Sequence, residues 1–370
     1  MAEQRAWVPW DLAERFIVAA FVHYGVSRRD AEICADVILE SDRRGIESHG
    51  CNRLKLMYVD RLRKGLIDPK APLEILKEGP ATVLADAHGG LGMAASVKIM
   101  RKVMEKAETA GIAMGAVRNS THYGIAGYYA MMAAKEGLLG ICGTNTRPAA
   151  APTFGAAPLL GTNPLAFAFP TDEAFPFVLD CATCVSSKGK VEYHGRIGAP
   201  TPEGVAIDRE GRPVTDTAAL LRSFKDGSAA LLPLGGAGED HGGYKGYGYA
   251  AVVEILSAAL SAGDFLSALS GIGKDGKRVP SRIGHFFIAL DPDFFMGRES
   301  FRKTCGAILR EIRSSPKAPG HDRIYTAGEK EYDIWQERKM KGVPLTEGVR
   351  KEFIVIRDEL GIPLRFPFEG

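Results

Sequence analysis

Two side chains near the N-terminus, His49 and Arg53, have the types and spacing of an acid/base pair for a carboxylate substrate. They follow the run Arg44-Gly45-Ile46-Glu47-Ser48. The segment from His49 to Lys64 has apolar residues at the three-and-four spacing of an amphipathic helix, on which residues four apart share a face. An imidazole changes protonation state near neutral pH, and a guanidinium can hold a carboxylate with two parallel hydrogen bonds. We therefore expect His49 and Arg53 to converge on one anionic ligand.

Ser48 is the expected N-cap of this helix, whose positive dipole end favours an anion. The competing interpretation is a surface helix with an incidental histidine. The choice between the two depends on the rest of the chain.

Composition indicates an ordinary globular protein. The chain has 370 residues, of which 45% are hydrophobic and 25% charged, enough for a substantial core and two subdomains. With 47 basic and 45 acidic residues, the net charge is only +2, and no long basic run with interleaved aromatic residues favours nucleic acid. A small-molecule partner is expected instead.

The segment Met1 to Trp10 lacks a basic region leading into an apolar core, and no apolar run reaches the roughly 18 residues that a membrane span requires. Six cysteines are too few for a disulfide scaffold in so long a chain. We therefore expect a cytoplasmic protein without a membrane segment. Cys181 and Cys184 form a Cys-x-x-Cys pair that could serve redox chemistry or zinc, but no second pair completes four ligands, so no metal site is predicted.

Periodicity predicts a helical opening followed by alternating strands and helices. Helices are expected at 12–24, 29–43, 49–64, 94–110, 127–135, 186–195, 298–314 and 346–360, with an apolar, buried helix at 249–262. Strands are expected at 81–85, 112–118, 138–143, 165–169, 175–180 and 284–290. Because each terminal helical stretch is too short to bury its apolar face alone, the two should pack together. This predicts a helical domain of residues 1–75 with 296–370, and a central α/β domain of residues 76–295.

A glycine motif, Gly90-Leu91-Gly92-Met93-Ala94-Ala95, resembles the dinucleotide fingerprint between a strand and a helix. A Rossmann unit for NAD would carry an acidic residue at the end of the next strand, where this chain has Arg118 and Asn119. We therefore interpret the motif as a lookalike.

Further segments are polar or glycine-rich where core packing would not require it. Each could supply a donor, a base or a phosphate contact, and each could instead be an ordinary turn or cap. They are Asn119 to Gly124, which contains Ser120 and His122; Gly161 to Pro164; Val178 to Thr183; the expected loop Gly242 to Gly248; and Gly328 with Glu329.

The order of these motifs is specific. The series Arg-Gly-Ile-x-Ser-His-Gly, Asn-Ser-x-His-x-Gly, Gly-Thr-Asn-Pro, Leu-Asp-x-Ala-Thr and Lys-Gly-x-Gly resembles the type 2 malate/L-lactate dehydrogenase family, also called the malate/ureidoglycolate/sulfolactate dehydrogenase family. The likeness runs from about Leu12 to about Glu331. It implies a NAD(P)-dependent oxidoreductase with an α+β (mixed α/β), non-Rossmann fold: a central mixed sheet and a helical domain built from the chain termini.

The resemblance also implies roles for individual residues. His49 would donate the proton to the carbonyl oxygen, with Ser48 orienting it and Arg53 holding the substrate carboxylate, and His122 could exchange roles with His49. The cofactor, NAD or NADP, would contact the residues Ser120, Thr146, Asp180, Cys181, Ala182, Thr183, Lys245, Gly328 and Glu329. The substrate would be a 2-hydroxy or 2-oxo acid, and the protein a homodimer.

Two departures from the family pattern bear on the cofactor. Tyr244 stands where many relatives have histidine, which leaves the choice of NAD or NADP open, and Cys184 stands where serine is more common. Two alternatives remain: a reductase of cyclic imino acids, and a non-catalytic dinucleotide-binding redox module that uses Cys181 and Cys184.

Overall fold

The structure, a computed structural model, describes residues 5–369. Two N-terminal helices, α1 (Trp10–His23) and α2 (Arg28–Arg43), pack against each other, and the Ser27 hydroxyl caps α2 by accepting from the Asp30 N–H. The C-terminal part returns to them. Strand β1 (Ala6–Val8) pairs with β11 (Val343–Leu345), while α10 (Glu329–Arg338) contacts α2 and α11 (Glu347–Leu360) contacts α1.

A seven-stranded mixed sheet forms the centre of the described molecule, in the order β2-β3-β4-β10-β5-β6-β7. Only β3 and β4 pair in parallel, and helix α4 (Gly92–Ala110) connects them. The strands are β2 (Glu74–Glu78), β3 (Thr82–Asp86), β4 (Ile112–Ser120), β5 (Leu139–Thr144), β6 (Leu165–Phe169), β7 (Phe177–Cys181) and β10 (Ile283–Leu290). The predicted mixed α/β fold with a central mixed sheet is confirmed.

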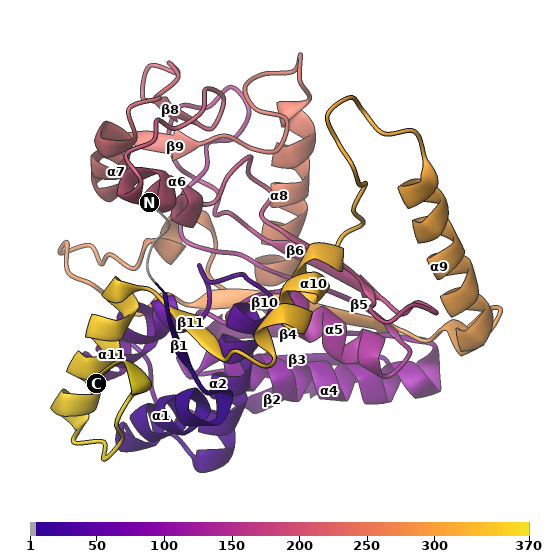
Figure 1. Ribbon diagram of the computed structural model, residues 1–370, viewed down its shortest axis with the longest axis horizontal. Helices are drawn as coiled ribbons and strands as arrows, with labels where there is room; N and C mark the ends of the chain where they lie inside the picture. Colours follow the sequence, from indigo (N-terminus) through magenta and orange to yellow (C-terminus); the bar gives the residue numbers. More distant parts are fainter. Residues whose placement is uncertain (1–4, 370) are drawn as a thin grey trace.

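Helices cover both faces of this sheet (Figure 1). Helix α4 and helix α5 (Gly127–Lys135) lie on the face that also packs against α1 and α2, and α8 (Gly243–Ala258) lies on the other. The largest apolar cluster joins α1, α2 and α11 to α4 and α5. Beside α8, a smaller lobe contains α6 (Lys188–Arg196), β8 (Ala206–Asp208), α7 (Thr217–Asp226) and β9 (Ala229–Leu231).

Helix α9 (Arg298–Ser314) stands apart from the N-terminal helices (Figure 1). Its arginines Arg302 and Arg310 bond instead to the loop between β6 and β7, at Thr171 and Asp172. The predicted division into two domains stays a prediction, and its ends at residues 1–4 and 370 lie outside the described residues. None of the helices within 5–369 is long and apolar enough to cross a membrane.

The space beside the glycine motif after β3 is occupied by the protein's own chain. Gly92 N–H donates to the Thr121 hydroxyl at 3.1 Å, and a Cβ at Gly92 would lie 2.0 Å from the Thr121 carbonyl oxygen. Arg118 is held by Asp86 at 2.8 Å. Because this close approach serves the protein backbone, the motif leaves no room for a pyrophosphate and is a Rossmann lookalike, as predicted.

Three local predictions are wrong. The continuous helix expected at 49–64 is a turn followed by a 3-10 helix (Cys51–Arg53), a π-helix (Leu54–Val59) and a short α3 (Asp60–Arg63). The expected loop Gly242 to Gly248 is mostly the first turns of α8. The helix expected to be buried at 249–262 exposes one side, with Tyr249 58%, Val252 48% and Ile255 59% accessible. Apolar composition alone does not distinguish a core helix from one with an uncovered face.

Candidate active site

Asp42 of α2 holds the turn that carries His49 in place through a hydrogen bond and a close packing contact. The Cys51 N–H donates to Asp42 Oδ2 at 2.8 Å, and a Cβ at Gly50 would lie 2.1 Å from Asp42 Oδ1, so only glycine fits there. Arg338 of α10 donates to the Asp42 carbonyl and to Glu47. Burial raises the pKa of Asp42 to about 7, so the carboxyl is close to half protonated at neutral pH. The turn therefore has a rigid support built from both ends of the chain.

Ser48 does not act as a helix cap. Its hydroxyl bonds His49 Nδ1 at 2.9 Å, and Gly50 occupies the position before the 3-10 helix. Arg53 reaches backwards and donates from Nε to the Ser48 carbonyl at 2.5 Å. The expected meeting of His49 and Arg53 thus arises from this backward reach, because the helix that would have aligned them begins too late.

His122 comes from the segment after β4 and lies beside His49. The two rings are stacked, with centroids 5.8 Å apart and an angle of 20° between planes. His122 Nδ1 receives the Gly124 N–H at 3.3 Å and is 2.7 Å from the Tyr58 hydroxyl. Since a backbone N–H can only donate, His122 Nδ1 acts as an acceptor and the ring proton belongs on Nε2.

Burial and positive charge keep both imidazoles neutral. Burial and then the Arg53 charge lower the pKa of His49 to about 4. The pKa of His122 is lowered well below its usual value by burial, and further by His49 and Arg53. Arg53 lies 3.8 Å from Glu192 of α6, and a Cβ at Gly189 would lie 3.4 Å from both Arg53 and Ser48. Helix α6 of the smaller lobe therefore packs against Ser48 and Arg53.

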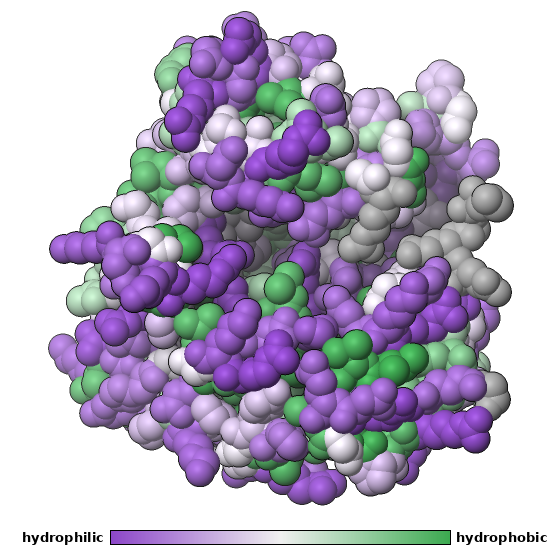
Figure 2. All heavy atoms as spheres, turned by 90° about the vertical axis from the view of Figure 1, so that its left-hand side faces the viewer, coloured by the Kyte–Doolittle hydropathy of each residue, from purple (hydrophilic) through white to green (hydrophobic). Residues whose placement is uncertain are grey.

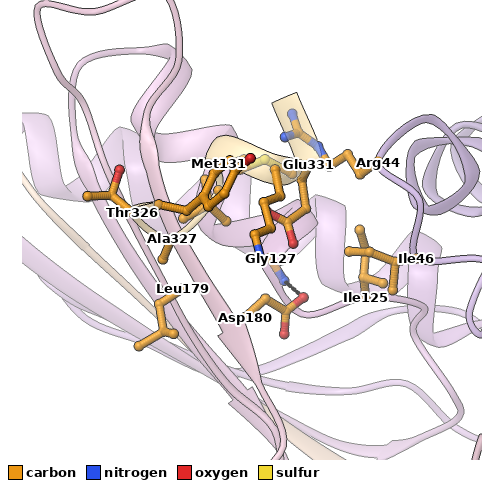
Figure 3. Close-up of a pocket in the computed structure, with 14 residues that line it drawn as sticks. Arg44, Ile46, Ile125, Gly127, Met131, Leu179, Asp180, Thr326, Ala327 and Glu331 are labelled. Atoms are coloured by element: carbon orange, nitrogen blue, oxygen red, sulfur yellow. Dashed lines mark hydrogen bonds between the residues drawn. The ribbon is translucent and has the colours of Figure 1, made fainter. Parts of the chain in front are cut away.

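A cavity of about 300 Å³ is lined by Ile46 and Ile125, which lie three residues from His49 and His122 along the chain (Figure 3). The Gly127 N–H at the start of α5 donates to Asp180 Oδ2 at 2.7 Å. Burial raises the pKa of Asp180 to about 6, and the charge of Glu331 adds to this increase. Figure 3 shows the carboxyl groups of Asp180 and Glu331 approaching the same space. Its other lining residues include Arg44, Ile46, Ile125, Met131, Leu179 and Gly328.

This cavity fits a nucleotide coenzyme. Asp180 Oδ1 and both oxygens of Glu331 form no hydrogen bond or ion pair with the described residues, so they can accept from sugar hydroxyls. Ile46, Ile125 and Leu179 supply apolar surface for a flat ring. No group of three or more His, Cys, Asp or Glu residues within 5–369 could hold a metal ion.

Several predicted cofactor residues surround this cavity or support it. Gly328 lines it with φ of +90°, against the backbone of Val178. Glu329 turns inward, only 2% exposed, and bonds Thr326 and Arg323. Cys181 and Ala182 follow Asp180 and are half-buried. Gly328 alone among these four lines the cavity.

The remaining predicted cofactor residues lie elsewhere. Ser120 is fully buried, with its hydroxyl 2.8 Å from His285 Nε2. The Thr183 hydroxyl donates to the Thr162 carbonyl at 3.1 Å, and the Thr146 hydroxyl receives the Thr162 N–H at 2.9 Å. Lys245 is exposed in the first turn of α8. The hydroxyls of Ser120, Thr183 and Thr146 therefore stabilise the chain, and only Lys245 projects freely.

Sequence reasoning missed three functional candidates. Tyr58 falls at an apolar position of the helix predicted over 49–64, although its hydroxyl contacts His122. Asp42 and Glu331 carried no motif that would single them out. Tyr58 and Glu331 act across long sequence separations, and Asp42 acts on a turn eight to nine residues further along the chain, neither of which periodicity reports.

Comparisons with known proteins identify relatives of this chain. The family model described as malate/L-lactate dehydrogenase matches residues 8–353. The malate dehydrogenase of Pyrococcus horikoshii is 42% identical over 96% of each chain, and the L-sulfolactate dehydrogenase of Methanocaldococcus jannaschii is 36% identical over 94% of this chain and 96% of its own. The crystal structure of malate dehydrogenase from Entamoeba histolytica superposes with a TM-score of 0.95 at 40% identity, covering 98% of this chain and all of the other.

The match extends over nearly the whole chain in sequence and in fold, and the chain therefore belongs to the malate/L-lactate dehydrogenase family, as a NAD(P)-dependent oxidoreductase of hydroxy acids.

Proposed function

We propose that this enzyme interconverts a 2-hydroxy acid and the corresponding 2-oxo acid, with His49 moving the proton and Arg53 holding the carboxylate next to the reacting carbon. The observation that carries the proposal is the pairing of two neutral, stacked imidazoles with an arginine, on chain segments whose residues Ile46 and Ile125 line the cavity. When bound, the coenzyme supplies or accepts the hydride. The protein positions the substrate and moves the proton.

The two histidines have different surroundings, which supports different roles. Protonation of His122 at Nδ1 would set it against the Gly124 N–H, so His122 is suited to remain neutral and donate a hydrogen bond from Nε2. His49 faces only the Ser48 hydroxyl on Nδ1, and a hydroxyl can rotate to accept. His49 is therefore the better proton carrier, and His122 the better hydrogen-bond donor to the substrate oxygen.

Asp180, Glu331 and Gly328 would hold the coenzyme sugar and ring, and Cys181 and Ala182 follow Asp180 in the chain. Lys245 is the candidate for a phosphate contact, since it is an exposed cation at the start of a helix. Whether NAD or NADP is used depends on this end of the site.

The direct test is oxidation of NADH and NADPH by a panel of oxaloacetate, pyruvate and a cyclic imine such as piperideine-2-carboxylate. Faster reduction of oxo acids than of the imine supports the proposal, and the reverse preference identifies an imino acid reductase. Coenzyme binding without any turnover would indicate the non-catalytic module. His49→Ala should lower turnover by about two to four orders of magnitude.

We also propose that the protein is a homodimer. The outer side of α8 exposes Tyr249, Val252 and Ile255 at three-residue spacing, and α9 exposes Ile308 and Ile312. Exposed apolar side chains gathered on one side of a helix are typical of an interface. A cytoplasmic location also remains a proposal, supported by six cysteines that form no disulfide.

A further inference from the structure

Helix α9 carries two arginines, one turn apart, that differ in what they contact. Arg310 donates to Asp172 at 2.8 Å and to Glu173 at 3.2 Å, both in the loop between β6 and β7. Arg313 also donates to Glu173, but its other terminal nitrogen donates to the Thr326 hydroxyl at 3.2 Å. Of these two arginines of the described chain, only Arg313 therefore joins α9 to the segment before α10.

The segment before α10 forms part of the wall of the coenzyme cavity. Thr326, Ala327 and Gly328 line the cavity, and the first two are labelled in Figure 3. The Ala327 carbonyl accepts from the Val178 N–H of β7 at 3.1 Å. Glu329, only 2% exposed, accepts from the Thr326 N–H at 3.0 Å and from its hydroxyl at 3.1 Å. The segment is thus tied both to an edge strand and to a buried carboxylate.

Two arginines balance the charge of Glu329. Arg323 donates to Glu329 Oε1, and Arg313 Nη1 lies 3.6 Å from Glu329 Oε2. Burial opposes the ionisation of Glu329, but the Thr326 N–H and Arg323 outweigh it and hold its pKa below the usual value. The Arg313 side chain is 18% exposed, so solvent screens this charge only in part. A buried carboxylate that loses a cation is unfavourable, and Thr326, which bonds the same carboxylate, would shift with it.

A pair of aromatic rings connects Arg313 with the first turn of α10. Its guanidinium carbon lies 5.9 Å from the centre of the Phe175 ring, and Phe175 stacks on Tyr332 with 5.1 Å between centroids. The residue before Tyr332 is Glu331, which lines the coenzyme cavity. Arg313 therefore supports two parts of the cavity wall, one through Thr326 and one through these rings.

We propose that Arg313 is a positioning residue for the coenzyme: it holds segment 323–329 in the conformation that binds the coenzyme, so that coenzyme affinity depends on how α9 is seated. Of the 17 residues of α9, Gly306 and Leu309 are the buried ones, so polar contacts contribute much of its attachment. The inference rests on the proposed function in one respect, the place of the coenzyme in this cavity. The contacts of Arg313 lead to the coenzyme segment, so its loss should weaken coenzyme binding without slowing the chemical step.

The test compares Arg313→Gln with Arg310→Gln, the same substitution one turn earlier in α9. Fluorescence titration with NADH in the absence of substrate measures the Kd. We expect the Kd to rise about 5- to 30-fold in Arg313→Gln and less than about twofold in Arg310→Gln. Arg313→Lys keeps the charge but can hold only one of the two partners, so its Kd should fall between those of wild type and Arg313→Gln. If Arg313→Gln does not fold, Arg313→Lys carries the same comparison. A residue that only seats α9 would give equal changes at both positions.

Hydrogen exchange and turnover separate this inference from the proposed function. The amides of segment 323–329 should exchange faster in Arg313→Gln than in Arg310→Gln, and kcat at saturating coenzyme should not fall. If no oxo acid is reduced but NADH affinity still depends on Arg313, the proposed function fails and the positioning role stands. Equal Kd values in the two glutamine variants, unchanged exchange in segment 323–329, or a lower kcat without a loss of affinity would overturn the inference.

Discussion

The proposed role of His49 depends on its imidazole being neutral in the free enzyme. In the proposed mechanism, burial and Arg53 lower the pKa of His49 to about 4, so that the free enzyme would hold a base ready to accept a proton from a hydroxy acid. In the opposite direction His49 must first be protonated, and a bound carboxylate favours this because it offsets the arginine charge. The sequence could nominate His49, Ser48 and Arg53 as site candidates from residue type, and their roles stay predictions. It could not identify Tyr58, since a phenol at a helical position is indistinguishable from a core side chain.

Replacing Arg53 should separate binding from chemistry. Arg53→Gln removes the cation expected to hold the carboxylate, and the KM for the oxo acid should rise about 10- to 100-fold with a smaller change in kcat. Arg53→Lys should restore little, because a lysine cannot present two parallel donors. Steady-state kinetics measure both, with Arg15→Gln, whose side chain is 62% exposed, as the control. An unchanged KM would remove Arg53 from the substrate site.

Asp42 makes the support of the turn sensitive to pH. Its pKa in the folded protein, about 7, lies above the value of 3.8 for a free carboxyl. The neutral form is therefore favoured by folding, and this contribution is full below pH 3.8 and lost as the pH rises through 7, by at most about 4 kcal/mol. Asp42→Asn keeps an acceptor for the Cys51 N–H but cannot ionise. The Tm of the variant relative to wild type should rise between pH 5 and pH 8, and a constant difference would show that Asp42 does not titrate in this range.

At the scale of elements, periodicity predicted most helices and strands but not the break at residues 51–59. Gly50 packs on the Asp42 carboxylate and the Cys51 N–H bonds it, so the helix is delayed by a contact that local patterns do not encode. The start of α8 was likewise missed. Four glycines between 242 and 248 indicate a loop on propensity alone, whereas Gly246 is required because the helix crosses the backbone of Leu234.

Two glycines in α8 give a matched test of that crossing. A Cβ at Gly246 would lie 2.4 Å from the Leu234 backbone, while at Gly248 nothing lies within 4 Å. Gly246→Ala should cost about 1–3 kcal/mol and raise the KM for the coenzyme, since Lys245 moves with the helix. Gly248→Ala should be neutral or stabilise by up to about 1 kcal/mol. Thermal unfolding and coenzyme titration measure the pair, and similar stability of the two variants would contradict this packing.

At the scale of the whole molecule, the site depends on pairings between distant segments. Strand β10 joins β4 to β5 although about 140 residues of chain separate β10 from β5, and α10 supports the turn of His49 from the far end of the chain. Composition and element order indicated the mixed sheet, but strand order follows from long-range packing that a single sequence does not reveal. The surface in Figure 2 is mainly hydrophilic, with scattered apolar residues. Helices α8 and α9 expose a further set of apolar side chains, which includes Tyr249, Val252, Ile255, Ile308 and Ile312.

A single substitution that introduces a charge into the exposed apolar side of α8 tests the proposed dimer. Ile255→Glu places a carboxylate in the exposed apolar side of α8 and should convert the protein to a monomer, because an unpaired charge is costly in an interface. Val355→Glu, the same type of change at a 40% exposed apolar position of α11, should leave the oligomeric state unchanged. Analytical ultracentrifugation distinguishes the two. A wild type that sediments as a monomer would refute the dimer.

The most direct test of the account is the pH dependence of kcat/KM in both directions for wild type, His49→Asn and His122→Asn. Because the pKa of free His49 is about 4, wild-type oxidation of the hydroxy acid should be independent of pH between 6 and 9, while reduction should fall about tenfold per pH unit. His122→Asn should keep this slope and lose rate, whereas His49→Asn should lose both. A slope that survives in His49→Asn and disappears in His122→Asn would contradict the assignment of His49 as the proton carrier.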